Sequence, residues 1–375
     1  MKTLIGVGVA VAALSLAPIP GAAGTTAGGA KVVHLQAPIA ALAMSGKRIA
    51  YDLTSTPVGN GSVTPNRLLV WNLATGAQTK VSGRQTAGAD GTAAGGVTGL
   101  AIAGTRVAWR ITDGGNTETY DDIYASSSVA PKERHVAGAG REGDQCGAGI
   151  AGPVPACAGT WLGGVVASGN KILINRWKTD ITGAITSGGL YTLREKRTLV
   201  PFDIGSTAVE AVAADVHRIA VQQWRWYDPD PTINVFSSSG ELQSTVTPAA
   251  QPRAVALSGH NLLVLLPRKI VLYDAQTGAL KRTFALHHNW QAAAIAVHGN
   301  VAAYSTATSR GYNSVRAINL TTGKDSFIGR LPGVIEQLAM DSAGLAYANN
   351  VWSLKDGYVV QLVFRPLGQV GAAVR

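Results

Sequence analysis

The chain has 375 residues, a formal charge of +10 at neutral pH and only 14% charged residues. Its lysines and arginines occur singly or in pairs, without the dense basic stripe of a nucleic-acid-binding protein, so we expect no nucleic-acid partner. The 45 glycines and the abundant Val, Ile, Leu and Thr favour many short strands joined by tight turns, and long amphipathic helical patterns are absent.

The first segment, residues 1–30, is predicted to be a signal peptide with a short leader. Lys2 precedes an apolar run from Leu4 to Ala17, which is too short to span a bilayer but suits secretion. Small residues at 21–23 and 28–30 offer two cleavage sites. No later apolar run is long enough for a membrane span. The sequence therefore predicts an exported, soluble protein of the cell envelope or the medium.

One eleven-residue pattern recurs seven times in the rest of the chain, with starts 40 to 65 residues apart, which is the spacing of propeller blades. In each copy a strand rich in small residues is followed by a turn and a second strand, which predicts an inner hairpin. The copies are LAMSGKRIAYD from Leu42, LAIAGTRVAWR from Leu100, VVASGNKILIN from Val165, VAADVHRIAVQ from Val212, VALSGHNLLVL from Val255, IAVHGNVAAYS from Ile295 and LAMDSAGLAYA from Leu338.

A second element follows each copy, and it is clearest as an outer hairpin of two strands in three units. In these units the pair is joined by Thr75-Gly76, Thr277-Gly278 or Thr322-Gly323, which places Gly where the hairpin loop needs a positive φ. The predicted fold is all-β, a seven-bladed β-propeller of four-stranded antiparallel blades. The last unit lacks a fourth strand, and residues 31–36 form an unassigned strand before the first copy. We therefore expect the N-terminal strand to close the last blade.

The segment GKRIAY from Gly46, followed by LLVWNLATGAQTKVS from Leu68, resembles the TolB-type and WD-repeat-like β-propeller repeats. The resemblance covers most of the chain after the leader and implies the fold alone, because unrelated binding proteins and enzymes share such blades. The usual Ser-Pro-Asp-Gly turn is shortened here to Met44-Ser45-Gly46. We assign residues 31–368 to the propeller domain and 369–375 to a C-terminal tail.

The two cysteines, Cys146 and Cys157, lie in one stretch rich in Gly and Pro. In an exported protein such a close pair is expected to form a disulfide. Because no second pair of Cys or His stands at zinc-ligand spacing, we expect no metal there and no cofactor elsewhere.

Evidence for catalysis is thin, since no nucleophile elbow, HExxH helix or phosphate-binding loop occurs. His217, His260 and His298 fall at or beside inner-hairpin turns and are interpreted as surface residues. Four residues remain candidates for an enzymatic site at the channel mouth: His287, His288, Asp113 and Glu118. The interpretation of Asp113–Asp122 that we favour is an acidic connector between strands.

The remaining signal is aromatic. Trp177 and Trp224 occupy the same repeat position, just beyond the second strand of neighbouring units. Because Trp, Tyr and Arg are enriched at binding sites, we predict a ligand surface there, although packing of the rings between blades is an equal alternative. Its predicted residues are Trp177, Trp224, Trp226, Tyr227, Arg176 and Arg225.

Two hypotheses of function follow. The first is a monomeric, non-catalytic binding scaffold that recognises a protein or glycan partner through one propeller face. The alternative is a secreted hydrolase or lyase that acts on an extracellular or cell-wall polysaccharide at the channel mouth.

Overall fold

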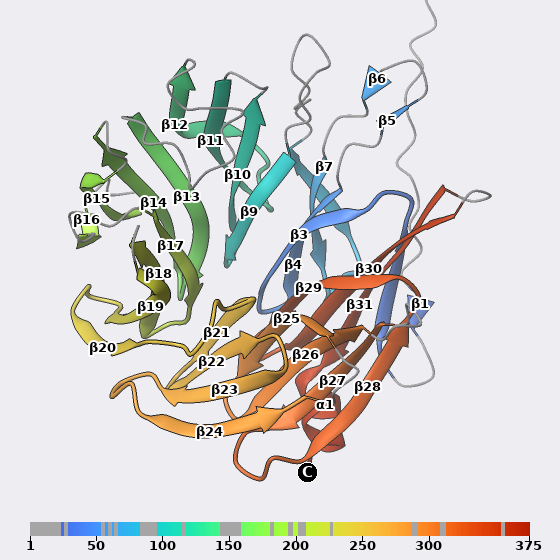
Figure 1. Cartoon of the computed structure of the whole chain (residues 1–375). Coiled ribbons are helices and arrows are strands. Elements are labelled where there is room, and N and C mark those ends of the chain that lie inside the picture. Colours follow the sequence, from blue (N-terminus) through green and yellow to red (C-terminus); the bar gives the residue numbers. More distant parts are fainter. Residues whose placement is uncertain are drawn as a thin grey trace, which may run out of the picture.

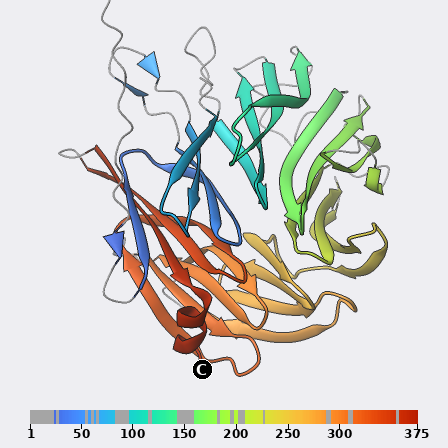
Figure 2. The same ribbon diagram turned by 180° about the vertical axis from the view of Figure 1, so that it is seen from behind.

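The structure is a computed structural model. It describes residues 24–25, 29–53, 57–58, 62–63, 67–82, 96–114, 118–142, 159–180, 184–193, 198–201, 208–225, 228–286, 291–307, 313–353 and 357–375. Seven antiparallel sheets stand around a central axis, as Figure 1 shows and Figure 2 repeats from behind. The predicted seven-bladed propeller of four-stranded blades is confirmed.

The first four blades contain these strands. Blade one has β3 (Ile39–Ser45), β4 (Arg48–Leu53), β7 (Arg67–Asn72) and β8 (Gln78–Ser82), and the hairpin β5 (Pro57–Val58) and β6 (Ser62–Val63) separates β4 from β7. Blade two has β9 (Gly96–Ala103), β10 (Arg106–Gly114), β11 (Glu118–Ser127) and β12 (Arg134–Glu142). Blade three has β13 (Gly159–Ser168), β14 (Lys171–Thr179), β15 (Ile185–Thr192) and β16 (Thr198–Pro201). Blade four has β17 (Ala208–Ala214), β18 (Arg218–Arg225), β19 (Asp228–Ser237) and β20 (Leu242–Val246).

The last three blades continue in the same order. Blade five has β21 (Ala254–Ser258), β22 (Asn261–Leu266), β23 (Lys269–Asp274) and β24 (Leu280–Ala285). Blade six has β25 (Gln291–His298), β26 (Val301–Ala307), β27 (Asn313–Asn319) and β28 (Asp325–Leu331). Blade seven has β29 (Val334–Met340), β30 (Gly344–Ser353) and β31 (Gly357–Pro366), beside which lie β2 (Lys31–Leu35) and β1 (Gly24–Thr25).

The hydrophobic core lies between neighbouring blades. Alternate side chains of a strand point to opposite faces of its sheet. The second strand of a blade therefore packs against the blades on both sides. In β4, Ile49 and Tyr51 join a cluster with Ala346 of blade seven, whereas Ala50 joins Trp109 of blade two. Burial of both faces explains why these strands carry apolar residues at consecutive positions.

The turns follow the sequence prediction. The Thr-Gly glycines Gly76, Gly278 and Gly323 have φ of 76°, 72° and 82°, in the left-handed region that favours glycine. The residue that begins each turn helps to hold it: the Asn72 side chain accepts a 2.9 Å hydrogen bond from the Ala74 N–H, as Asp274 and Asn319 do in their blades. The hairpin turns of all blades lie on one side of the ring, which we call the turn face. The connections between hairpins lie on the other side, the loop face.

A hydrogen bond between neighbouring blades recurs on the turn face, and we call it the latch. In each latch, a side-chain oxygen at the end of an innermost strand accepts the N–H of the turn glycine in the next blade. Ser45 accepts from Gly104 and Ser258 from Gly299, both at 3.0 Å. Asp215 and Asp341 take the same role toward Gly259 and Gly46.

The N-terminal strand β2 belongs to the sheet of blade seven, and blade seven also contacts blade one. β2 pairs antiparallel with β31 from Lys31 opposite Phe364 to Leu35 opposite Val360. Near the loop face, the Asn350 carboxamide accepts the Ile39 N–H at 3.0 Å and donates to the Ile39 carbonyl at 3.1 Å. The side chain thus makes the pair of hydrogen bonds to the Ile39 backbone that a residue of a neighbouring strand would make, and it links the two blades.

The helix α1 (Leu367–Ala373) follows β31 and does not appear in the sequence prediction. Its Val370 and the following Val374 are buried in one cluster with Ala30 and Val363. Tertiary packing therefore explains a helix that contains two glycines and has no side-chain N-cap. Within the described residues, no helix has the length and hydropathy needed to cross a membrane.

Candidate functional site

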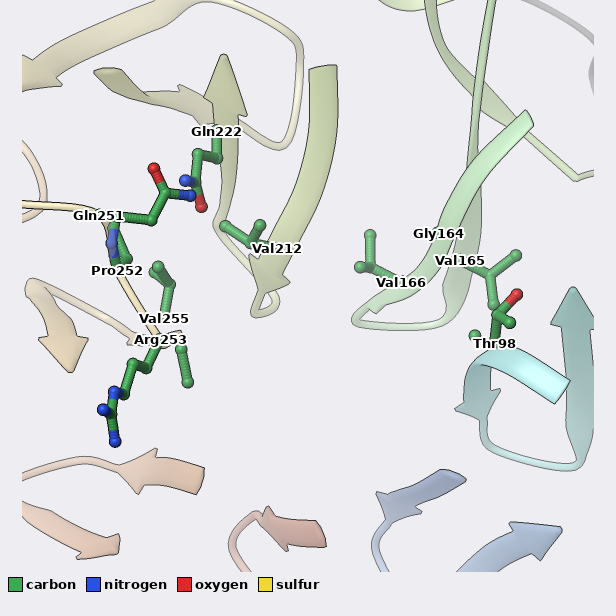
Figure 3. A pocket seen from close by; sticks show the side chains of 12 residues that line it. Thr98, Gly164, Val165, Val166, Val212, Gln222, Gln251, Pro252, Arg253 and Val255 are labelled. Atoms are coloured by element: carbon green, nitrogen blue, oxygen red, sulfur yellow. The ribbon is translucent and has the colours of Figure 1, made fainter. Parts of the chain in front are cut away.

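A cavity of about 420 Å³ opens in the central channel between blades two and five. Innermost strands form most of its wall, because the small residues predicted to crowd around the channel leave space between them. Figure 3 shows Gln222, Gln251, Pro252, Arg253 and Val255 on one side, with Thr98 and Val165 on the opposite side. The lining residues are Thr98, Gly99, Gly164, Val165, Val166, Val212, Gln222, Gln251, Pro252, Arg253, Ala254 and Val255.

Two polar side chains of this cavity were not recognised from the sequence. Gln222 is only 4% exposed, and its Nε2 atom has no hydrogen-bond partner within the described part of the chain. Arg253 is exposed and donates from Nη1 to the Ala292 carbonyl at 3.3 Å. The alignment of repeats did not set Gln222 apart, because the fifth residue of the second strand is polar in most blades and apolar in the next one, where it is Leu265.

This fifth position is polar in most blades but serves different purposes. In blade six, Ser305 accepts the N–H of Ala294 at 3.1 Å, where β25 bulges out of register. In blade two, Arg110 pairs with the buried Asp121 at 2.8 Å. In blade three, Asn175 is fully buried, and among the described residues neither of its amide atoms finds a partner.

Asp52 holds the fifth position in blade one. It is fully buried, and within the described ranges neither carboxyl oxygen has a hydrogen-bond partner. It lies on the same side of β4 as Ala50, toward blade two. Burial raises the pKa of the Asp52 carboxyl to about 7, because the charged form loses its hydration.

Trp177 lies at the loop-face end of β14 and is 8% exposed. Its ring stacks on that of Trp161 in the neighbouring strand, with the centroids 6.3 Å apart and the planes at 4°. Trp161 donates from Nε1 to the Thr179 hydroxyl at 2.8 Å, which fixes the ring. Both belong to the cluster between blades three and four, while Arg176 points to the opposite side of the strand and is exposed.

The backbone of β18 brings Trp224 and Arg225 to the loop-face end of blade four, the same strand position that Trp177 and Lys178 occupy in blade three. Ala208 lies opposite Trp224 in the ladder. The side chains of both residues, and all of Trp226 and Tyr227, are outside the described part of the structure. The predicted aromatic surface therefore remains a prediction.

Of the other residues singled out from the sequence, some lie outside the described part of the structure and some lie within it. Cys146, Cys157, His287 and His288 lie outside the described residues. Asp113 is the last residue but one of β10 and Glu118 is the first of β11, and these strands pair, so most of the predicted connector belongs to a hairpin. Among the side chains that are described, no three of His, Cys, Asp and Glu gather as metal ligands.

No protein-family model matches the sequence, and neither does any curated protein. Among solved structures, the chain resembles the β-propeller domain of the trilobed protease from Pyrococcus furiosus, with 11% identity, a TM-score of 0.56, and coverage of 88% of this chain and 95% of that one. It also resembles the Pyrococcus horikoshii acylaminoacyl peptidase, with 12% identity, a TM-score of 0.55, and coverage of 90% and 54%. A structure of WD40 repeats matches with 10% identity, a TM-score of 0.50, and coverage of 89% and 97%. These likenesses confirm the predicted resemblance at the level of the fold.

Proposed function

We propose that this protein is an exported, non-catalytic binding scaffold that recognises a protein or glycan partner through its loop face. The propeller fold suits such a role because its rigid blades present the connecting loops on one surface. The observation that carries the proposal is the stacked pair of Trp161 on β13 and Trp177 on β14, next to the exposed Arg176 and Lys178. Fixed aromatic rings beside an arginine are typical of binding hot spots.

The proposed surface extends to blade four through Trp224, Trp226, Tyr227 and Arg225. Because Trp224 shares its strand position with Trp177, the seven-fold repeat supports a similar height and radius for both. The buried Trp177 then supports the surface from within the interface between blades three and four, and the exposed residues around it contact the partner.

Trp224→Ala is expected to weaken partner binding by about 2 kcal/mol or more, roughly thirtyfold, because a large ring leaves the contact. The partner is first captured from the envelope fraction of the source organism with the immobilised wild-type protein, and affinities are then measured with the purified components. His260→Ala removes an exposed ring from the turn face and serves as the matched control. Equal affinities for the wild type and a folded Trp224→Ala protein would refute the surface.

The competing hypothesis, a hydrolase or lyase, places His287, His288, Asp113 and Glu118 at the channel mouth. Wall and extracellular polysaccharides are incubated with the wild type and with His288→Ala. If the wild type breaks down a polymer and the variant does not, the enzyme hypothesis is correct and the proposal of a non-catalytic scaffold is wrong.

The proposed export of the protein can be tested separately, through the state of its two cysteines. Protein collected from the culture medium should lack the leader and contain a Cys146–Cys157 disulfide, seen by mass spectrometry as linked peptides before reduction. Replacing both cysteines by Ser should lower stability by only about 2 to 3 kcal/mol, because the loop that they close is short. Free thiols in freshly secreted protein would contradict the pairing.

A further inference from the structure

The channel cavity combines an apolar wall with hydrogen-bond donors. Val165, Val166, Val212, Val255 and Pro252 contribute the apolar surface, and the volume of about 420 Å³ lies within the range of small-molecule sites. Among the lining residues that the structure describes, Arg253 alone carries a charge. The pocket therefore offers a positive and partly apolar environment.

Among the polar side chains at this strand position without a hydrogen-bond partner in the described residues, Gln222 is the one that lines the cavity. Its side chain is nine-tenths buried and lines the cavity, and its Nε2 donor has no partner among the described residues. A buried donor without an acceptor costs about 1 to 3 kcal/mol, so such a donor usually meets a ligand or a water. The fold does not need a polar side chain here, since Leu265 and Ala348 occupy the same strand position in blades five and seven.

Arg253 supplies the second recognition group. Its contact with the Ala292 carbonyl uses one of five N–H donors and orients the guanidinium group at the edge of the cavity. In Figure 3, Gln222 and Arg253 stand on the same wall, with Gln251 and Pro252 between them. A ligand along this wall can therefore meet a neutral donor at one end and a cation at the other.

We propose that the channel cavity binds a small carboxylate that carries a second hydrogen-bond acceptor and an apolar side chain. The carboxylate accepts from Arg253. The second acceptor meets the Gln222 Nε2 once the carboxamide turns this buried atom toward the cavity, and the ligand's side chain packs on the valines. An N-acyl amino acid has this chemistry, and so does the C-terminal residue of a peptide. The site shares no lining residue with the aromatic loop-face surface and stands whether or not that surface binds a partner.

The test uses N-acetyl-leucine, N-acetyl-leucinamide and the peptide acetyl-Ala-Ala-Leu with a free C-terminus. Binding to the full chain is measured by calorimetry up to about 10 mM, which covers the weak affinities of small ligands. Both acids are expected to bind, and the amide is expected to bind at least tenfold more weakly because it cannot pair with Arg253. Stronger binding of the peptide points to a chain terminus as the natural source, and stronger binding of N-acetyl-leucine points to a free metabolite.

Variants of the lining residues test whether the ligand binds in the cavity. Arg253→Gln and Gln222→Leu should each weaken binding of the acids at least fivefold, whereas Arg268→Gln, which removes an exposed charge from the same blade outside the cavity, should leave it unchanged. Gln222→Glu keeps the side-chain size and replaces the donor with a carboxylate, so it should also weaken binding if Gln222→Leu does not fold. No binding to the wild type, or equal binding to the wild type and the folded variants, would overturn the proposal.

Discussion

Val33→Asp is expected to lower the thermal midpoint by about 4 to 7 °C, because it places an unpaired charge in the interface between blades seven and one. Val33 is fully buried in the middle of β2 and packs with Val360 and Leu362 of β31. Deletion of residues 31–37 should have a larger effect, since it would also leave the backbone of β31 as an open sheet edge that promotes aggregation.

The matched control is His34→Asp, which adds the same charge to the next residue of β2, where the side chain is exposed. Thermal unfolding and size-exclusion chromatography at one protein concentration compare the three proteins with the wild type. If Val33→Asp and His34→Asp had the same midpoint, or if the deletion protein stayed monodisperse and equally stable, β2 would not contribute to closure of the ring.

Asp52→Asn should stabilise the protein at alkaline pH by up to about 4 kcal/mol, because it removes a buried carboxylate without changing the size of the side chain. The pKa of the Asp52 carboxyl is raised by burial to about 7 in the folded state, against an ordinary value of 3.8. Between these two values the folded chain binds more protons than the unfolded chain. The free energy of unfolding contributed by this group is therefore highest below pH 4 and falls as the pH rises toward 7, after which it is constant.

Urea unfolding of the wild type and Asp52→Asn at pH 4 and pH 8.5 measures this difference. The variant should be more stable than the wild type at pH 8.5 and close to it at pH 4. Glu336→Gln, an exposed carboxylate on β29, should show no such dependence. A gain for Asp52→Asn that is equal at both pH values would mean that the carboxyl does not titrate in this range.

The fold followed from the sequence because its determinants are local and repeated. The inner-hairpin pattern is required within each blade and occurs in seven copies, and the Thr-Gly turn of the outer hairpin recurs in three of them. α1 could not be predicted in this way, since its glycines disfavour a helix and the burial of Val370 and Val374 against blades six and seven stabilises it.

The candidate site was harder to predict because it depends on how blades meet. Gln222 and Arg253 are far from Thr98 in the sequence and share a cavity only after the ring has closed. Trp177 did contain a local signal: it alternates with Leu173 and Asn175 along β14, and all three face blade four. The alternation of these three residues indicates that the Trp177 ring is buried. The exposed Arg176, between Asn175 and Trp177, indicates that the other face of the strand is at the protein surface.

The latches on the turn face all run in one direction around the ring. Each acceptor belongs to one blade and each donor to the blade that follows, as in Ser45 with Gly104, and the pair of Asp341 and Gly46 joins the last blade to the first. A ribosome makes the blades in that same order, so every donor except one emerges after its acceptor. Gly46 is the exception, because Asp341 is synthesised nearly 300 residues later, when six blades already exist. Blade one is therefore the first blade to be made and the last to complete its contacts.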